Sequence, residues 1–254
     1  MTIASYNING IRSALRKGIA DWIQSTGFDL YCFQELKANI EDIDTGIFEV
    51  LGYYNFWFPA EKKGYSGVGI ISKAKPDLVV YGIEDDKFDR EGRVIRADYG
   101  ALSVISAYFP SGSSGEERQE YKMSFLDAFN DYVQKLIRTR PFLIISGDYN
   151  ICHQPIDIHD PVRLKNTSGF LPEERAWVTN FLRSGFTDSF RKLRPEQEGY
   201  SWWSYRAQSR AKNLGWRIDY NIISSTMIKN LIDADILSDV VHSDHCPIYL
   251  KINS

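Results

Sequence analysis

Short apolar runs alternate with polar turns along this chain, and most of the runs have the length of β-strands. Runs of about four to eight apolar residues, rich in β-branched and aromatic side chains and bounded by turn residues, predict strands. We therefore expect strands near residues 2–8, 29–34, 53–58, 67–72, 76–82, 93–98, 102–109, 142–147, 217–224 and 247–252. Those between residues 53 and 109 follow one another closely, which favours antiparallel pairing.

Helical spacing of apolar residues occurs between some of these strands. The clearest case is 116–139, where Phe125 and Phe129 belong to a series of apolar residues three or four positions apart. Glutamates near its start and basic residues near its end suit the helix dipole. Two more helices are expected at 12–25 and 172–184.

The order of these elements indicates one α/β domain that spans residues 1–254. The chain has no linker, low-complexity tract or shift in composition that would divide it. Hydrophobic residues make up 43% of the chain and aromatic residues 14%, which is ample for a large core. Strands that pair in sequence, with helices between some of them, favour a mixed-sheet sandwich with outer helices.

Composition excludes several classes of protein. The chain has no apolar run of the roughly 18–20 residues that a membrane span needs and no basic-then-apolar leader, so we expect no membrane association. Cys32, Cys152 and Cys246 form no CxxC pair, which predicts reduced, buried thiols in a cytoplasmic protein. The net charge of −3 neither demands nor excludes a nucleic-acid partner, because local charge decides such binding.

Polar side chains follow several of the apolar runs. The run that ends at Gly147 is followed by Asp148, Tyr149 and Asn150. Taken alone, a strand that ends in Gly-Asp is often only a turn. Comparable groups recur at or beside the ends of other runs: Asn7, Glu35, Tyr108, Asp219, Asp244 and His245. Rigid strands that present such groups at one end can gather them in one cleft.

These groups form an oxygen-rich set that suits a hard divalent cation. The candidate ligands are Glu35, Asp148, Asp219, Asp244, Asn7 and Asn150. Magnesium or manganese fits oxygen ligands, whereas zinc would need more histidine and cysteine than this chain offers in one place. The alternative is that each acid only caps a helix or pairs with a lysine, and Lys37 lies close enough to Glu35 for that.

His245 needs a carboxylate partner to act as an acid or base, because such a partner fixes its tautomer and raises its basicity. Asp219 is the natural candidate, since it opens a strand that can lie beside the one following His245. Asp244 serves equally well by sequence alone. A histidine in such a turn is otherwise a hydrogen-bonded structural residue.

The segment 191–217 is the best nucleic-acid feature. It combines basic residues with interleaved aromatic ones: Arg191, Lys192, Arg194, Arg206, Arg210, Lys212 and Arg217 with Trp202, Trp203, Tyr205 and Trp216. Basic side chains suit phosphate contacts, and aromatic faces suit stacking on an exposed base or packing on a sugar. The alternative is a solvated loop whose tryptophans fill the core.

Taken together, the motifs resemble the exonuclease III family of AP endonucleases, in the family's order and over nearly the whole chain. They are Asn7-Ile8-Asn9-Gly10, Gln34-Glu35-Leu36-Lys37, Tyr65-Ser66-Gly67-Val68-Gly69, Tyr108-Phe109-Pro110, Gly147-Asp148-Tyr149-Asn150, Gly169-Phe170, Pro172-Glu173-Glu174-Arg175, Trp216-Arg217-Ile218-Asp219-Tyr220 and Ser243-Asp244-His245-Cys246-Pro247. The resemblance implies a four-layer α/β sandwich with two central mixed, largely antiparallel sheets flanked by helices.

The resemblance also implies a function. It is that of a Mg²⁺-dependent enzyme, with Mn²⁺ as a substitute, that incises DNA 5′ to abasic sites and has 3′→5′ exonuclease, 3′-phosphatase and 3′-phosphodiesterase activity. The expected partner is double-stranded DNA with abasic sites or blocked 3′ ends. The expected state is a monomer in the cytoplasm, associated with the nucleoid if the source is a prokaryote.

By motif position, the resemblance assigns a role to each group. Glu35 resembles the principal metal ligand, with Asn7 and Asp244 nearby, and Asp148 and Asn150 border the same site. His245 with Asp219 resembles the pair that binds the phosphate or activates water, and Tyr108 a phosphate-side donor. Asp148 and Asn150 resemble the nucleophile-positioning pair, Asp148 and His245 are both candidates for the general base, and one-metal and two-metal arrangements both fit. The implied DNA and abasic-pocket residues are Trp202, Trp216, Ile218, Arg217, Gly169, Arg206, Arg210 and Lys212.

Three features depart from the family pattern. Asn9 stands where some relatives carry an aspartate. The segment from Ser111 to Ser114, which includes Gly112, replaces the amide and the later arginine that some members carry after Tyr-x-Pro. Leu164, Thr167 and Ser168 replace most of the asparagines that some relatives use for phosphate contacts. These departures bear on the balance between endonuclease and exonuclease action more than on the reaction class.

Two other functions compete with the repair endonuclease. One is a lipid, inositol-phosphate or RNA phosphodiesterase with the same catalytic core, against which the basic, tryptophan-rich segment 191–217 argues. The other is a DNA-binding module that has lost catalysis. The sequence argues against that module, because every proposed catalytic position holds a functional residue.

Overall fold

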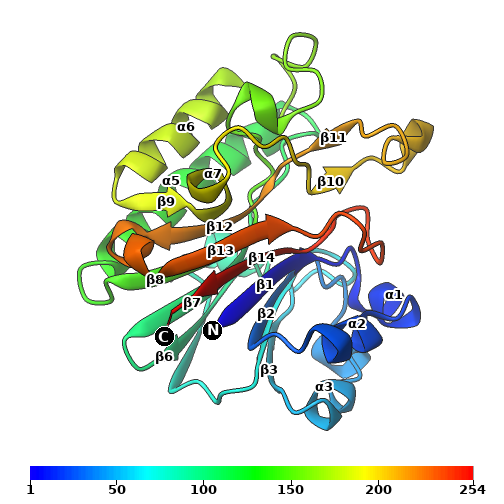
Figure 1. Cartoon of the computed structure of the whole chain (residues 1–254), viewed down its shortest axis with the longest axis vertical. Coiled ribbons are helices and arrows are strands. Elements are labelled where there is room, and N and C mark those ends of the chain that lie inside the picture. Colours follow the sequence, from blue (N-terminus) through cyan, green and yellow to red (C-terminus); the bar gives the residue numbers. More distant parts are fainter. Residues whose placement is uncertain (254) are drawn as a thin grey trace.

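Two six-stranded β-sheets face each other, and helices cover their outer faces (Figure 1). The computed structural model describes residues 1–253. The arrangement is the four-layer α/β sandwich expected from the sequence, with both sheets mixed and largely antiparallel.

The first sheet has the strand order β13-β14-β1-β2-β4-β3. Its strands are β1 (Thr2–Asn7), β2 (Leu30–Gln34), β3 (Tyr54–Phe58), β4 (Val68–Ser72), β13 (Leu231–Ile236) and β14 (Ile248–Ile252). Its one parallel pair is β1 with β2, near the middle of the sheet. The strands β1 and β14, far apart in the sequence, are antiparallel neighbours.

The second sheet has the order β5-β6-β7-β8-β12-β9. Its strands are β5 (Leu78–Tyr81), β6 (Val94–Tyr99), β7 (Leu102–Tyr108), β8 (Phe142–Asp148), β9 (Phe186–Asp188) and β12 (Asp219–Ser224). The parallel pair here is β7 with β8, again near the middle. A separate two-stranded ribbon joins β10 (Trp202–Trp203) to β11 (Gly215–Trp216).

Helices and short 3₁₀ turns connect the strands. The helices are α1 (Ile11–Arg16), α2 (Ile19–Thr26), α3 (Gly46–Val50), α4 (Asp86–Asp89), α5 (Glu116–Leu136), α6 (Pro172–Arg183) and α7 (Ser189–Leu193). The 3₁₀ turns are η1 (Ile40–Asp42), η2 (Pro155–Asp157), η3 (Arg206–Gln208) and η4 (Ser225–Asn230). Among the described residues, no helix is long and apolar enough to cross a membrane.

Three apolar layers hold the sandwich together. The central layer lies between the sheets, where Ile3, Val104 and Ile144 are buried completely. Residues of α5 and α6 such as Phe129 pack on the outer face of the second sheet. Those of α1, α2 and α3 pack on the outer face of the first. Removal of this apolar surface from water is the main stabilising contribution.

All ten strands expected from the sequence are present, with ends that differ by one or two residues. The expected helix at 12–25 is divided at Gly18, which adopts a left-handed conformation with φ of 89°. The sequence missed β13, because aspartates are unusual in strands. There Asp233 and Asp235 accept hydrogen bonds from Arg194. The three cysteines are buried and free, as expected.

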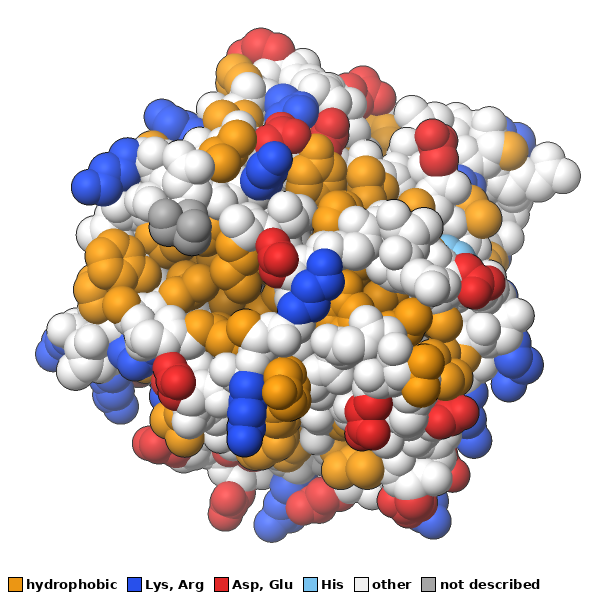
Figure 2. Space-filling view, turned by 60° about the horizontal axis from the view of Figure 1, so that its bottom comes forward, with side chains coloured by type: hydrophobic (Ala, Val, Ile, Leu, Met, Phe, Trp, Pro, Cys, Tyr) orange, Lys and Arg blue, Asp and Glu red, His pale blue; other side chains and the backbone are white. Residues whose placement is uncertain are grey.

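The carboxyl ends of β1, β2, β7 and β8 lie at one end of the sandwich, because each pair is parallel and Asn7 at the end of β1 contacts Asp148 at the end of β8. The ribbon β10–β11 lies beside this end (Figure 1). On the face shown in Figure 2, acidic and basic side chains of the described residues are scattered singly among hydrophobic ones. Neither charge is concentrated on that face.

Candidate active site

A polar cavity of about 420 Å³ opens where the strand ends meet. Its lining includes most of the groups that the sequence singled out: Asn7, Asn9, Glu35, Lys37, Tyr108, Ser111, Ser113, Asp148, Asn150, Thr167, Ser168, Gly169, Trp202, Trp216, Ile218, Asp244 and His245. They come from both sheets and from the connections around them. The fold thus brings together residues that lie at opposite ends of the sequence.

The partner of His245 is Asp219. Nδ1 of His245 lies 2.9 Å from Oδ2 of Asp219, and both side chains are almost fully buried. Asp219 opens β12 and lies directly opposite Asp148 of β8 in the antiparallel register. Asp148 Oδ2 is 3.8 Å from Nε2 of His245, so the imidazole lies between two carboxylates. Asp244, the other candidate, instead accepts hydrogen bonds from Asn9 and Trp202.

Ser201 holds Asp219, although no pattern in the sequence pointed to it. Its hydroxyl donates to Oδ2 of Asp219 at 2.6 Å and accepts from the backbone N–H groups of Ile218 and Asp219. Such a local contact of a buried serine follows only from the three-dimensional path of the chain. It fixes the carboxylate that His245 uses.

Asp148 is held by two asparagines. Asn7 donates from Nδ2 to Oδ2 of Asp148 at 2.9 Å, and the backbone N–H of Asn150 donates to Oδ1 at 2.8 Å. Burial and the neighbouring Asp219 raise the pKa of Asp148 to about 7, outweighing these hydrogen bonds and the nearby His245. The carboxyl therefore titrates near neutral pH, as a general base requires.

The surroundings of His245 favour its charged form. Burial alone would lower its pKa, but Asp219, Asp148 and Asp244 outweigh burial and raise the pKa of His245 to about 10. The imidazole is therefore a cation at neutral pH. A buried cation beside the cavity suits an anionic phosphate better than it suits proton removal.

Glu35 and Asp244 also line the cavity with carboxylates. Glu35 pairs with Lys37 at 3.0 Å, so the alternative interpretation of Glu35 as a lysine partner is realised in part. Nζ of Lys37 also donates to Oδ1 of Asn9. Burial alone would raise the pKa of Asp244, but His245, Asn9 and Trp202 outweigh it and hold the pKa of Asp244 below its usual range.

Oxygen atoms are plentiful in this part of the cavity, where the carboxylates of Glu35 and Asp244 lie with the amides of Asn7 and Asn9. That donor set fits a hard divalent cation. The described residues also hold one closely packed group of possible ligands, Asp148, Asp219 and His245. There the histidine–aspartate hydrogen bond already occupies Nδ1 and Oδ2, which disfavours metal binding by that group.

Tyr108 ends β7 and lines the cavity. Burial raises the pKa of its phenol well above the usual range, and the carboxylates of Glu35 and Asp148 add to this, so the hydroxyl stays a hydrogen-bond donor. Arg93, which the sequence did not single out, packs its guanidinium 5.0 Å from the Tyr108 ring and donates to the Tyr108 carbonyl. It supports the position of the tyrosine.

Two tryptophans and an isoleucine form one wall of the cavity. The rings of Trp202 and Trp216 meet edge to face at 6.1 Å, and Ile218 packs in the same cluster. Gly169 faces this wall with φ of 96°, and a Cβ there would come within 3.0 Å of the Trp216 ring. These four predicted pocket residues do lie together.

The three basic residues of the β10–β11 loop differ in their surroundings. Arg206 and Lys212 are exposed. Arg210 packs on Trp203 at 4.6 Å and donates to the carbonyls of Ser238, Val240 and Ser243. It therefore fixes the loop that precedes Asp244 and His245, which leaves Arg206 and Lys212 as the two of the three that can meet a large ligand.

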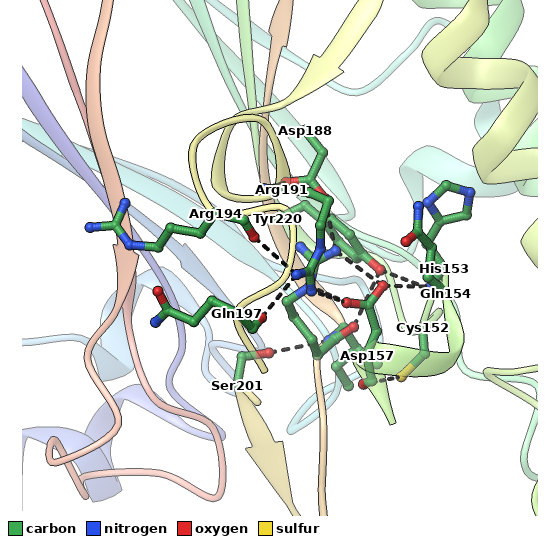
Figure 3. Close-up of polar contacts among 12 residues, drawn as sticks. Cys152, His153, Gln154, Asp157, Asp188, Arg191, Arg194, Gln197, Ser201 and Tyr220 are labelled. Carbon is green, nitrogen blue, oxygen red and sulfur yellow. Dashed lines mark hydrogen bonds and ion pairs between the residues drawn. The ribbon is translucent and has the colours of Figure 1, made fainter. Parts of the chain in front are cut away.

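Arg217 does not reach the cavity, which corrects the prediction that it contacts DNA. Its side chain is 1% exposed, and its guanidinium pairs with Asp157 at 2.7 Å and with Asp188 at 2.8 Å. Side chains alternate along an extended segment, so Trp216 and Ile218 face the cavity and Arg217 points away from it. Figure 3 shows Asp157 and Asp188 converging from separate segments on this buried network.

The rim of the cavity carries short hydroxyl side chains. Ser111 and Ser113 line one edge, and Thr167 and Ser168 line another. These are positions at which the sequence departs from the family pattern.

The two-sheet sandwich, with acids, amides and a histidine–aspartate pair gathered at one end of both sheets, defines a class of phosphoester-cleaving enzymes. The model of the Endonuclease/Exonuclease/phosphatase family matches residues 4–245. The chain belongs to this family.

Named relatives agree with that assignment. The chain is 41% identical to an exodeoxyribonuclease of Bacillus subtilis, with all of both chains covered. It is 39% identical to the DNA repair nuclease APEX1 of Danio rerio, covering 98% of this chain and 81% of the relative. An AP endonuclease structure from Archaeoglobus fulgidus superimposes with a TM-score of 0.92 at 30% identity, with all of both chains covered. A 3′ phosphatase from Neisseria, bound to a product DNA hairpin, gives 0.94 at 27% identity, again with all of both chains covered.

Proposed function

We propose that this chain is a Mg²⁺-dependent DNA-repair phosphodiesterase that incises the backbone 5′ to abasic sites and also processes 3′ ends. The observation that carries this proposal is one cavity that combines the His245–Asp219 pair and Asp148 with a wall of Trp202, Trp216 and Ile218. The relatives named as an AP endonuclease and an exodeoxyribonuclease support it. One domain, residues 1–254, would carry the whole activity as a monomer.

In the proposed reaction the protonated His245 binds a non-bridging oxygen of the scissile phosphate. The gap of 3.8 Å between His245 Nε2 and Asp148 Oδ2 sets the phosphate beside the base. Asp148 takes a proton from an in-line water, and its pKa of about 7 suits that task. Asn7 and Asn150 keep the carboxylate aimed, and Tyr108 donates to a second phosphate oxygen.

Glu35, Asp244 and Asn7 are the residues that would hold the cation. When bound, Mg²⁺ supplies Lewis-acid neutralisation of the charge on the phosphate and the leaving oxygen. Without a cation, Lys37 pairs with Glu35, and Asn9 donates to Asp244. The acids therefore face the cavity before any cation binds.

The aromatic wall would select the lesion. An abasic nucleotide has no base to unstack, so its rotation out of the duplex costs less than that of a normal nucleotide. A sugar without a base can pack on Trp216 and Ile218, and the close approach of Gly169 to the Trp216 ring leaves this wall no room for a larger side chain. Selection by shape needs no hydrogen bond to a base.

A second candidate is a role mainly at 3′ ends. The observation that favours it is the rim of short hydroxyls at Ser111, Ser113, Thr167 and Ser168, which cannot wedge deeply into a duplex. A frayed end enters such a rim more easily than an internal site does. The likeness to the Neisseria 3′ phosphatase is consistent with this candidate.

One assay separates the two candidates. End-labelled duplex DNA with a single tetrahydrofuran abasic analogue is incubated with the protein and Mg²⁺, beside an intact duplex and a duplex with a 3′-phosphate. We expect one incision 5′ to the analogue. Shortening or dephosphorylation from the 3′ end without that incision would favour the 3′-end role, and no reaction on any duplex would overturn both candidates.

A further inference from the structure

A lysine and a glutamate form an ion pair in the interior, directly behind the cavity. Nζ of Lys122, on α5, lies 2.5 Å from Oε1 of Glu174, on α6, and both side chains are 0% exposed. Neither residue lines the cavity. Buried charges are rare, and a buried pair is often no more stabilising than apolar residues of the same volume. The pair therefore needs an explanation other than stability.

Lys122 reaches beyond its partner to the backbone of the active site. Nζ donates to the carbonyl oxygen of Asn150 at 2.9 Å. Asn150 has φ of 53°, a left-handed conformation that is strained for a residue with a side chain. The same residue donates its backbone N–H to Asp148. The Lys122 ammonium thus fixes the backbone of Asn150, and Asn150 in turn orients the Asp148 carboxylate.

Glu174 holds the opposite side of the cavity. Its Oε2 accepts hydrogen bonds from the backbone N–H groups of Gly169, at 2.7 Å, and Leu171, at 3.0 Å. The carbonyl of Gly169 in turn accepts from the N–H of Cys152, two residues beyond Asn150. The carboxylate fixes the loop that faces Trp216.

Gln119, on the same helix as Lys122, also links Glu174 to the cavity. Gln119, three residues earlier on α5, donates from Nε2 to Oε1 of Glu174 at 3.0 Å. Its own Oε1 accepts from the hydroxyl of Ser168, which lines the cavity. One face of α5 therefore contacts both edges of the site through Glu174 and Asn150.

We propose that Lys122 and Glu174 are positioning residues of the active site: Lys122 fixes the Asn150 peptide, Glu174 fixes the Gly169 loop, and the ion pair sets the separation of these two sides. The inference rests on the proposed roles of Asp148 and of the cavity in hydrolysis. It predicts losses in turnover from residues that touch neither substrate nor metal.

A charge-balanced double variant separates positioning from stability. Lys122→Met alone leaves a buried carboxylate without a cation, so we expect both a lower Tm and a lower kcat. In Lys122→Met/Glu174→Gln the charges are removed together, which restores most of the Tm because no unpaired charge remains. The contact to Asn150 is still missing, so kcat should stay about 10- to 100-fold below wild type with KM changed less than about threefold.

Hydrogen exchange measured by NMR tests the same point without activity. We expect the Asn150 amide to exchange faster in the double variant than in wild type at matched Tm, because Asn150 is no longer anchored by Lys122. This readout holds even if the wild-type protein fails to cut abasic DNA, so failure of the proposed function and failure of this inference are distinguishable.

Asp98→Asn is the matched control. Asp98 is also buried and paired with an arginine, Arg96, but lies at the far end of β6. We expect this variant to lower the Tm and to leave kcat and the exchange of the Asn150 amide unchanged. Recovery of wild-type kcat and Asn150 exchange in the double variant would overturn the proposal and make the pair purely structural.

Discussion

At the residue scale, the surroundings raise the pKa of both Asp148 and His245, which gives the two neighbouring groups different charges. Asp148 and His245 lie in the same buried cluster, yet burial and Asp219 favour the neutral form of Asp148, while the surrounding carboxylates favour the charged form of His245. One group is therefore available to accept a proton near pH 7, and the other is available to bind an anion. Burial is the largest cause of the shift in Asp148, and the antiparallel register that sets Asp219 opposite Asp148 adds to it.

The pH dependence of kcat/KM should report Asp148. Only its ionised form accepts a proton, so below its pKa of about 7 the rate should fall, roughly tenfold per pH unit. The measurement is kcat/KM on abasic duplex between pH 5 and 9. In Asp148→Asn, kcat/KM should be lower by several orders of magnitude and should no longer fall below pH 7. An unchanged pH profile in that variant would exclude Asp148 as the base.

His245→Ala should reduce kcat by about 10³-fold, the upper end of what removal of one hydrogen-bond donor to the developing charge costs. The variant leaves Asp219 and Asp148 close together without the intervening cation, so its Tm should also fall at neutral pH. Single-turnover cleavage beside a thermal melt distinguishes the two effects. A folded variant with near wild-type turnover would remove His245 from the mechanism.

The Mg²⁺ concentration for half-maximal rate should rise when Glu35 is replaced and fall when Lys37 is replaced. EDTA should abolish cleavage. Glu35→Gln should raise the Mg²⁺ concentration for half-maximal rate by about tenfold or more, because the site then has one carboxylate ligand fewer. Lys37→Gln should lower that concentration, because the ammonium 3.0 Å from Glu35 no longer competes with the cation. Equal shifts in both variants would count against Glu35 as a ligand.

Residue types and their order along the chain were enough to predict the groups that line the cavity, because few kinds of side chain can bind a metal ion or transfer a proton. They could not choose between Asp219 and Asp244 as the partner of His245, since that depends on strand register. They also misplaced Arg217, because a basic residue beside two cavity residues points the opposite way in an extended segment. Ser201, Arg93 and Lys122 carry no chemical signal in the sequence and depend on tertiary contacts.

At the scale of elements, the ribbon β10–β11 carries the exposed part of the predicted DNA contact. Its strands hold Trp202 and Trp216 in the wall, while its loop presents Arg206 and Lys212 to solvent. The sequence predicted this segment as basic and aromatic, and the structure divides it into a fixed wall, a buried network around Arg217 and an exposed loop. Of these three parts, the exposed loop is the one suited to phosphate contacts.

Salt dependence of DNA binding should therefore respond to the loop. Removal of one phosphate contact should reduce the slope of log K against log salt by about 0.9, so Arg206→Gln/Lys212→Gln should reduce it by nearly 2. The measurement is fluorescence anisotropy in EDTA between 50 and 200 mM salt. Lys229→Gln, on the η4 turn away from the ribbon, is the control and should leave the slope unchanged.

At the scale of the whole molecule, the two sheets are joined by the apolar layer between them, and the cavity depends on that contact. The ten expected strands are present because each is a mainly apolar run, whereas the short strands β9, β10 and β11 and the aspartate-containing β13 were missed. The two-sheet arrangement came from family resemblance, since periodicity does not determine which strands are neighbours.

Truncation in the central layer should cost stability without touching chemistry. Ile144→Ala removes a completely buried side chain between the sheets and should lower the free energy of unfolding by about 2–5 kcal/mol. Urea denaturation measures the change. Val50→Ala, at an 89% exposed position, should change it by less than about 0.5 kcal/mol, and kcat of both folded variants should match wild type.

The pairing of β1 with β14 has a consequence for the time at which the protein becomes active. Asn7 belongs to β1, and His245 lies just before β14. While β14 is still on the ribosome, β1 has β2 but not β14 as a neighbour, and His245 has no fixed place. We therefore expect the growing polypeptide to be unable to cut a nucleic-acid backbone until β14 joins the sheet.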